Sequence, residues 1–244
     1  MEAPEFQTAD LSRLRWLISG GAPLPAYIID AYQQRGLTFK QGYGLTEVGV
    51  NCFAMTAGDS RRKPGSIGKP MLFTEARLVN DELWLRGPHV SKGYWNNPQA
   101  TAAAIDGEGW FHTGDVARCD EEGFYYISGR AKDMFISGGV NVYPAEVEQA
   151  LLQHPALQDV AVIGVPHAKW GEAGAAFVVL RPGLQATVDE LSEFLAQRLA
   201  RYKIPSRWFF QSSLPRTAYG KVIKPELARQ YDALANSAEP QKST

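Results

Sequence analysis

The sequence predicts a mixed fold, with an α/β segment first, a small antiparallel β unit next and a separate α+β domain last. Three observations predict this order. Two short apolar runs flank a helix-like stretch in the first fifty residues, turn-rich alternating runs occupy about 64–129, and apolar strands with amphipathic helices fill about 130–228. Strand, helix and strand in succession are typical of a parallel sheet, whose loops after the strand ends carry ligands.

The α/β segment begins with the apolar run LRWLIS at 14–19, which stops at two glycines. PAYIIDAYQQRG at 25–36 predicts a helix, because Pro25 suits the first helical position and Gly36 suits the end. LTFKQGYG then predicts a second strand that runs into glycines.

The antiparallel β unit is predicted to end near residue 129. ARLVNDELWLRG contains two alternating runs around Asn80 and Asp81, which together indicate a hairpin. GWFHTGDVA and GFYYISGR supply further short strands. Residues 1–129 are therefore predicted to form one domain.

Residues 130–228 are predicted to form the α+β domain. A helix is expected in YPAEVEQALLQHP, from Pro144 to a point before Pro155, and DVAVIGVP and AAFVVLRP are nearly continuous apolar strands. Thr187 and Glu190 make a capping box ahead of a helix with one apolar face. Residues 229–244 are small and polar, and we expect them to form a flexible tail.

Composition narrows the class of protein. The 244 residues are 45% hydrophobic and carry a formal net charge of −1, which is typical of a globular chain and gives no electrostatic reason to expect nucleic acid as a partner. Cys52 and Cys119 lie far apart, which fits a reducing compartment. No apolar run is long enough to span a bilayer and no secretory signal opens the chain, so the sequence predicts a cytoplasmic protein.

Several polar residues in glycine-rich loops are candidates for chemistry. Thr46 could donate to a phosphate and Glu47 could bind Mg²⁺ through its hard oxygens. Asp115 could accept from both hydroxyls of a ribose, and Arg130 could add a second contact. Lys221 could offset charge on phosphate and carboxylate oxygens. Taken by itself, a residue of this kind is more often part of a solvated turn or surface than of a ligand site.

The order of five segments is more specific. SGGAP, GYGLTE, GWFHTGD, GRAKDMFISGGVNVYPAEVE and PRTAYGK resemble, in this order, the adenylate-forming superfamily of acyl- and aryl-CoA synthetases, peptide-synthetase adenylation domains and firefly-type luciferases. The resemblance covers about residues 12–228, and this part of the chain is similar to the C-terminal half of such an enzyme. It implies that residues 1–129 end the large AMP-binding domain and that residues 130–228 form the small C-terminal lid domain.

The resemblance implies a role for each matching residue on the ATP side. Those that would contact ATP, AMP or its Mg²⁺ are Gly21, Ala22 and Pro23 at the adenine and acyl pocket, Tyr43 on adenine with Gly44 beside it, Thr46 on phosphate, Glu47 on Mg²⁺, and Asp115 with Arg130 on the ribose. Lys221 would be the lysine needed for adenylation.

The resemblance also implies a coenzyme A side. Lys132 would lie at the hinge between the domains, and Gly138 and Gly139 would border the pantetheine tunnel. Trp170 and Tyr202 are looser matches to residues that can flank coenzyme A.

The function implied is that of an acid–CoA ligase. Such an enzyme activates a carboxylic acid, here a fatty acid by preference, with ATP to an acyl-adenylate and then transfers the acyl group to coenzyme A. The expected partners are therefore a small carboxylic acid, ATP and CoA, and a homodimer is left open. Two alternatives also remain open: an aryl-CoA ligase of the coumarate or ferulate type, and a non-catalytic module that binds nucleotide or CoA.

One departure from the family's pattern lies ahead of Tyr43. The family's Ser/Thr/Gly-rich phosphate-binding loop comes well before YGLTE, and the 42 residues that precede Tyr43 contain no such cluster. We therefore expect a truncated chain with little or no adenylation activity by itself.

Overall fold

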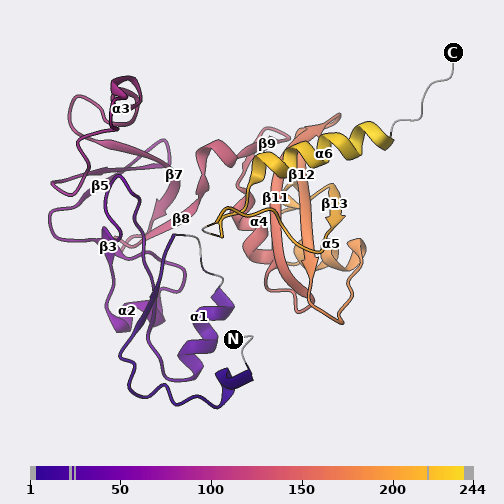
Figure 1. Cartoon of the computed structure of the whole chain (residues 1–244), viewed down its shortest axis with the longest axis horizontal. Coiled ribbons are helices and arrows are strands. Elements are labelled where there is room, and N and C mark those ends of the chain that lie inside the picture. The colour runs from indigo at the N-terminus through magenta and orange to yellow at the C-terminus, as the bar shows by residue number, and fades with distance from the viewer. Residues whose placement is uncertain (1–3, 22–23, 25, 219, 239–244) are drawn as a thin grey trace. The chain divides into compact units, whose positions relative to one another are not determined.

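The computed structural model describes residues 4–21, 24, 26–218 and 220–238 (Figure 1). The chain divides into two compact units, residues 1–132 and 133–244, where the sequence predicted a division between 129 and 130. Each unit has its own hydrophobic core. No helix in the described ranges is both long and apolar enough to cross a membrane.

The first unit opens with the predicted strand, helix and strand. Its elements are the 3₁₀ helix η1 (Pro4–Gln7), strand β1 (Leu17–Ser19), helix α1 (Ala26–Gln34) and strand β2 (Phe39–Gln41). β1 and β2 pair in parallel, with Leu17 opposite Phe39. Gly36 has φ = 78°, a conformation that L side chains avoid, so it ends the helix as predicted.

A short antiparallel pair and a small helix follow the glycine-rich loop. They are β3 (Phe53–Ala54), α2 (Ala57–Arg62) and β4 (Lys69–Pro70). Thr56 caps α2, because its hydroxyl accepts from the Asp59 amide while the Asp59 carboxylate accepts from the Thr56 amide. This helix was not predicted from the sequence.

The predicted antiparallel β unit is a four-stranded sheet in the order β5-β6-β7-β8. Its strands are β5 (Glu75–Val79), β6 (Glu82–Arg86), β7 (Phe111–Cys119) and β8 (Tyr125–Arg130), with helix α3 (Pro98–Ala104) between β6 and β7. Asn80 and Asp81 both have positive φ, at 50° and 66°, and form the predicted hairpin turn. Buried side chains of this sheet, among them Leu83, Leu85 and Phe111, share one core with Tyr43 and Phe53.

The second unit is the predicted α+β domain. Its elements are β9 (Phe135–Ser137), β10 (Val140–Val142), α4 (Pro144–Leu151), β11 (Leu157–His167), β12 (Gly171–Leu180), α5 (Val188–Ala196), η3 (Arg201–Lys203), β13 (Arg207–Phe210) and α6 (Lys224–Ala238), and the 3₁₀ turn η2 (Ala131–Asp133) precedes them at the boundary. The sheet has the order β10-β9-β12-β11, and β13 pairs in parallel with β12.

Side-chain alternation along β11 and β12 places two cores on opposite faces of this sheet. Val160 and Val162 pack with Leu151 of α4 and Leu191 of α5, whereas Ala161 packs on the other face with α6. Figure 1 shows the long β11–β12 hairpin between these helices. Both strands are therefore buried on both faces, which explains their nearly continuous apolar sequences.

The end of α6 differs from the predicted tail. Residues 229–238 continue the helix, since Leu227 is buried on the sheet and the ring of Tyr231 lies 6.0 Å from that of Phe209. These contacts favour helix beyond residue 228 despite the polar sequence. Residues 239–244 lie outside the described ranges.

Candidate functional site

The ends of β1 and β2 bring two predicted segments together. The amide of Gly42 donates to the Ser19 carbonyl over 2.7 Å, and a Cβ on Gly20 would lie 3.3 Å from the Gly42 carbonyl oxygen. Gly21 follows with φ = 87°. The SGGAP and GYGLTE loops therefore lie side by side, as expected for the carboxyl ends of parallel strands. Ala22 and Pro23, the other two predicted pocket residues, lie outside the described residues.

Gly44 occupies the tightest position of the GYGLTE loop. A Cβ there would lie 2.2 Å from the carbonyl oxygen of Gly49, and the amide of Leu45 donates to that same oxygen over 3.1 Å. Only glycine allows this approach of one backbone to another. The turn that results carries an exposed Thr46 and a half-buried Glu47.

Asp115 is the centre of the first cluster of predicted residues. It is only 3% exposed, its Oδ2 accepts from the Tyr43 hydroxyl over 2.6 Å, and its Oδ1 lies 2.6 Å from Nε of Arg130. Arg130 stands directly opposite Asp115 in the β7–β8 ladder. The carboxylate is thus oriented by a hydroxyl and a guanidinium.

Tyr43 is itself nearly buried, at 8% exposed, and its ring contacts Phe53 edge-on at 5.7 Å between centroids. Burial and then the charge of Asp115 raise the pKa of Tyr43, so the hydroxyl stays a donor at neutral pH. Thr113, which the sequence analysis missed, accepts from the Asp115 amide over 3.0 Å. The predicted packing of Tyr43 on adenine remains a prediction.

Glu47 has a partner that the sequence analysis also missed. Its Oε1 accepts from the hydroxyl of Tyr94 over 2.9 Å, and its backbone carbonyl accepts from the Ser91 amide over 2.7 Å. Burial and then Glu47 raise the pKa of Tyr94, so this hydroxyl also donates at neutral pH. The SKGYW segment carries no signal in the sequence that would link it to residue 47, because the two are joined only by folding.

The chemistry of Glu47 fits one ligand of Mg²⁺. Its Oε2 has no hydrogen-bond or ion-pair partner within the described ranges. Those ranges also contain no group of three or more His, Cys, Asp or Glu side chains that could hold a metal. Mg²⁺ is commonly bound by one or two carboxylates together with substrate phosphates and water, so a single free carboxylate oxygen suits that role.

The second unit contains a pocket of about 640 Å³ that collects three predicted residues. Gly138 has φ = 61°, its amide donates to the Trp170 carbonyl over 2.9 Å, and a Cβ there would lie 2.8 Å from Cε3 of Trp170. Tyr202 lines the same pocket, together with two cations that the sequence analysis did not select, Lys169 and Arg201. Gly139 follows Gly138 with φ = 84°.

Lys221 and Lys132 do not line the Gly138 pocket. Lys221 is exposed on the turn before α6, where its amide donates to the hydroxyl of Thr217 over 3.2 Å. Lys132 is in the 3₁₀ turn η2 and is the last residue of the first unit. The adenylation and hinge roles of these two lysines remain predictions.

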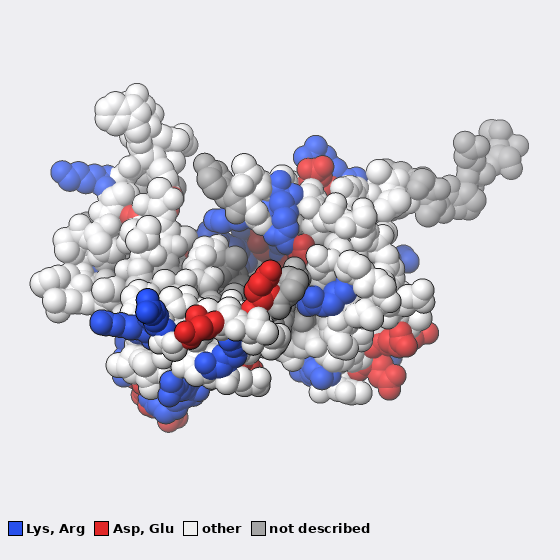
Figure 2. All heavy atoms as spheres, turned by 60° about the horizontal axis from the view of Figure 1, so that its bottom comes forward, with Lys and Arg blue, Asp and Glu red and all other residues white. Residues whose placement is uncertain are grey.

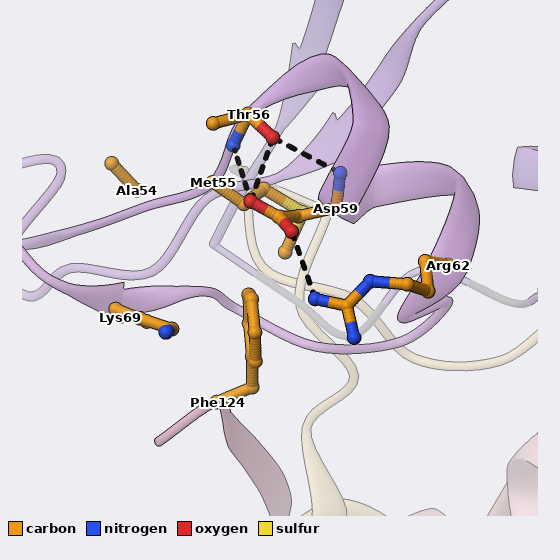
Figure 3. Close-up of a pocket in the computed structure, with 7 residues that line it drawn as sticks. All are labelled: Ala54, Met55, Thr56, Asp59, Arg62, Lys69 and Phe124. Carbon is orange, nitrogen blue, oxygen red and sulfur yellow. Dashed lines mark hydrogen bonds and ion pairs between the residues drawn. The ribbon is translucent and has the colours of Figure 1, made fainter. Parts of the chain in front are cut away.

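A second pocket, of about 380 Å³, lies beside α2 in the first unit (Figure 3). Its polar groups bond to one another: Asp59 accepts from the Thr56 hydroxyl at 2.6 Å and from Arg62 at 3.1 Å. Arg62 and Lys69 also lie over the ring of Phe124, at 5.4 and 4.6 Å from its centroid. We therefore interpret this pocket as structural. On the face shown in Figure 2, Lys and Arg side chains occur together with Asp and Glu side chains.

The fold and the two clusters define a class: a two-unit protein of the adenylate-forming type. Residues 1–95 match the model of the AMP-binding enzyme family, and residues 146–221 match that of the AMP-binding enzyme C-terminal domain. The chain belongs to this family and corresponds to the C-terminal half of its members, which confirms the resemblance seen in the sequence.

Curated relatives are named as CoA ligases. The chain is 44% identical to a feruloyl-CoA synthase from Amycolatopsis sp over 239 residues, which are 93% of this chain and 48% of that protein. It is 40% identical to the long-chain-fatty-acid–CoA ligase FadD13 from Mycobacterium tuberculosis, covering 95% of this chain and 48% of that protein. The chain thus spans about half the length of the curated relatives it matches.

Solved structures agree with the fold. The o-succinylbenzoate CoA synthetase from Bacillus subtilis, in complex with its acyl-adenylate intermediate, matches with a TM-score of 0.82 and 36% identity over 87% of this chain and 46% of that chain. An anthranilate CoA ligase in complex with anthranoyl-AMP matches with a TM-score of 0.87 and 32% identity, over 96% of this chain and 48% of that chain.

Proposed function

We propose that this chain supplies the C-terminal part of an AMP-forming acid–CoA ligase, which activates a carboxylic acid with ATP and transfers the acyl group to coenzyme A. The observation that carries the CoA half of this proposal is the pocket of the second unit. Its walls combine the aromatic rings of Trp170 and Tyr202 with the cations Lys169 and Arg201. Coenzyme A presents an adenine ring and several phosphates, which are the groups that aromatic faces and lysine or arginine bind.

The narrow side of this pocket suits the pantetheine arm. Gly138 lies against Trp170 so closely that any side chain at Gly138 would enter the indole, and Gly139 continues the same turn. The bare backbone of the two glycines would let an unbranched chain lie close along this wall of the pocket. The thiol at its end would then attack the acyl carbonyl, and AMP would leave.

The ATP half of the proposal rests on the first unit. Asp115, held by Tyr43 and Arg130, would accept from both ribose hydroxyls. Thr46 would donate to a phosphate oxygen, and Glu47 would hold the Mg²⁺ that neutralises charge on the phosphate oxygens. Gly21 and Gly44 would lie beside the nucleotide in these loops.

Two lysines complete the proposed roles. The ammonium of Lys221 would stabilise charge on the α-phosphate while the carboxylate of the acid attacks it and pyrophosphate leaves. Lys132 would be the hinge position at which the second unit changes its arrangement between the two half-reactions.

The acid is proposed to be a fatty acid. The relation to a long-chain-fatty-acid–CoA ligase supports this choice. The alternative, an aryl acid of the ferulate type, is supported by the relation to a feruloyl-CoA synthase. Pyrophosphate release measured with matched panels of fatty and aromatic acids, on the protein extended to the length of its relatives, distinguishes the two.

Titration of this chain with coenzyme A by calorimetry tests the proposal. Coenzyme A should bind, and Gly138→Ala should weaken its binding at least tenfold, because the added methyl group displaces the Trp170 ring and strains a residue with positive φ. Gly183→Ala is the matched control, since Gly183 also has a positive φ, of 78°, but a Cβ there contacts nothing within 4 Å.

Equal affinities of both glycine variants for coenzyme A would contradict the assignment of the pocket. No CoA binding by the unmodified chain would contradict the CoA half of the proposed function. Tight CoA binding by an extended protein that never releases pyrophosphate would favour the non-catalytic module instead.

A further inference from the structure

Tyr94 makes a contact with Glu47 that none of the roles above explains. Its hydroxyl donates to Oε1 of Glu47 over 2.9 Å, while Oε2 has no partner among the residues that the structure describes. The two oxygens of the Glu47 carboxylate therefore differ in their hydrogen bonding. One is engaged by the protein, and the other is available to a ligand.

The segment that carries Tyr94 is itself firmly held. The Tyr94 amide donates to the hydroxyl of Thr101 over 2.9 Å, and its carbonyl accepts from the amide of Asn97, the residue that caps α3. Gly93 packs so tightly on Thr101 that a Cβ would lie 2.5 Å from its Cγ2. The hydroxyl of Tyr94 is thus presented from a fixed backbone and not from a free loop end.

A second bond ties the same segment to the backbone of Glu47. The Ser91 amide donates to the Glu47 carbonyl over 2.7 Å. The segment therefore holds residue 47 at two points, the main chain through Ser91 and the side chain through Tyr94. Because the backbone contact does not involve the Tyr94 ring, loss of the hydroxyl would release the carboxylate without releasing the turn.

We propose that Tyr94 is a positioning residue that holds Oε1 of Glu47, so that the carboxylate offers the single oxygen Oε2 to the divalent cation of the bound nucleotide. This inference rests on the proposed function, because it takes Glu47 as the metal carboxylate. A carboxylate restricted to one oxygen suits the compact octahedral shell of Mg²⁺. Ca²⁺ has a larger shell and often takes both oxygens of a carboxylate, so the contact would also disfavour Ca²⁺.

The test uses the ¹⁵N-labelled chain with Mn²⁺ and ATP as the probe, since bound Mn²⁺ broadens nearby amide signals. In the unmodified chain the amides of residues 45–48 should broaden. Tyr94→Phe should raise the Mn²⁺–ATP concentration for half-maximal broadening roughly three- to tenfold. This loss of affinity is small for a residue that hydrogen-bonds to a metal ligand, because Tyr94 is 41% exposed.

Metal preference is the readout that a merely structural role would not change. With Oε1 of Glu47 released in Tyr94→Phe, both oxygens become available to a metal, and the concentration of Ca²⁺ that displaces Mn²⁺, relative to that of Mg²⁺, should fall severalfold. Tyr126→Phe is the matched control, because Tyr126 also donates to a carboxylate, that of Asp120, over 3.3 Å. That variant should leave both the broadening and the Ca²⁺ to Mg²⁺ ratio unchanged.

The inference is overturned if Tyr94→Phe behaves like Tyr126→Phe in both measurements. It is also overturned if the amides of 45–48 stay sharp in the unmodified chain. Adding coenzyme A to the same sample separates these results from failure of the proposed function, because CoA should shift signals of the Gly138 pocket whatever happens at Glu47.

Discussion

At the scale of single residues, the candidate site contains groups whose side chains are oriented by their neighbours. The carboxylate of Asp115 is oriented from two sides by Tyr43 and Arg130, and the Asp115 amide donates to the Thr113 hydroxyl. Residue types and their order in the chain could predict the first three residues. The part of Thr113 could not be predicted, since a threonine two positions before an aspartate in a strand is ordinary until the ladder register is known.

Gly44 gives a prediction at this scale. Gly44→Ala should lower the free energy of unfolding by about 3 kcal/mol or more, because its methyl group would overlap the backbone of Gly49 and Val50, which cannot rotate away as a side chain can. Urea unfolding measures the change. Gly107→Ala, in the same unit, is the control, since a Cβ on Gly107 contacts nothing within 4 Å. Equal stabilities of the two variants would show that the loop can move aside.

At the scale of elements, the sequence predicted those parts whose evidence is local. Strand alternation, the Asn80-Asp81 turn and the Thr187 capping box are each encoded within a few residues, and all are present. Helix α2 was missed because only six residues form it, although Thr56 and Asp59 carry a capping signal. The predicted end at residue 228 was based on polarity, whereas burial of Leu227 and packing of Tyr231 extend α6.

The turn between β7 and β8 shows how charge supports an element. Oδ1 of Asp120 accepts from the amides of Glu122 and Phe124 over 3.0 and 2.9 Å, and its Oδ2 lies 2.7 Å from Nζ of Lys63. The Lys63 contact, together with the two amides, lowers the pKa of Asp120 to about 2. The ionised carboxylate therefore holds the turn and links it to the end of α2.

This turn predicts a specific dependence of stability on pH. Because the pKa of Asp120 is lower in the folded than in the unfolded chain, its contribution is fully present above about pH 4 and is lost as pH falls towards 2. The stability difference between the unmodified chain and Asp120→Asn should therefore shrink between pH 5 and pH 2 in urea unfolding. Asp189→Asn, at an exposed position in α5, serves as the control. A difference that stays constant across this range would contradict the role of the ionised carboxylate.

At the scale of the whole molecule, the proposed ATP and CoA sites belong to two units that have separate hydrophobic cores. Among the described residues of the first unit, a core cluster at the β5–β8 sheet includes Tyr43, which bonds to Asp115. The second unit has two cores on opposite faces of one sheet, and the Gly138 pocket belongs to it alone. The sequence could predict the two-domain organisation, because composition and periodicity change near residue 130. The resemblance implied that Gly138, Trp170 and Tyr202 lie beside one ligand, but composition and periodicity could not predict that they line one pocket, since that depends on strand pairing in the second unit.

Separate cores predict separate unfolding transitions. Calorimetry of the chain should show two transitions, and coenzyme A should raise only that of the second unit, because a ligand stabilises the unit that binds it. At one hundred times its dissociation constant the stabilisation is about 2.7 kcal/mol, which for a unit of roughly a hundred residues corresponds to a rise of roughly 10 °C. The transition of the first unit should stay in place, and Gly138→Ala should reduce the rise to about half or less at the same concentration of coenzyme A. A rise of both transitions together, or of the first alone, would place the CoA site outside the pocket of the second unit.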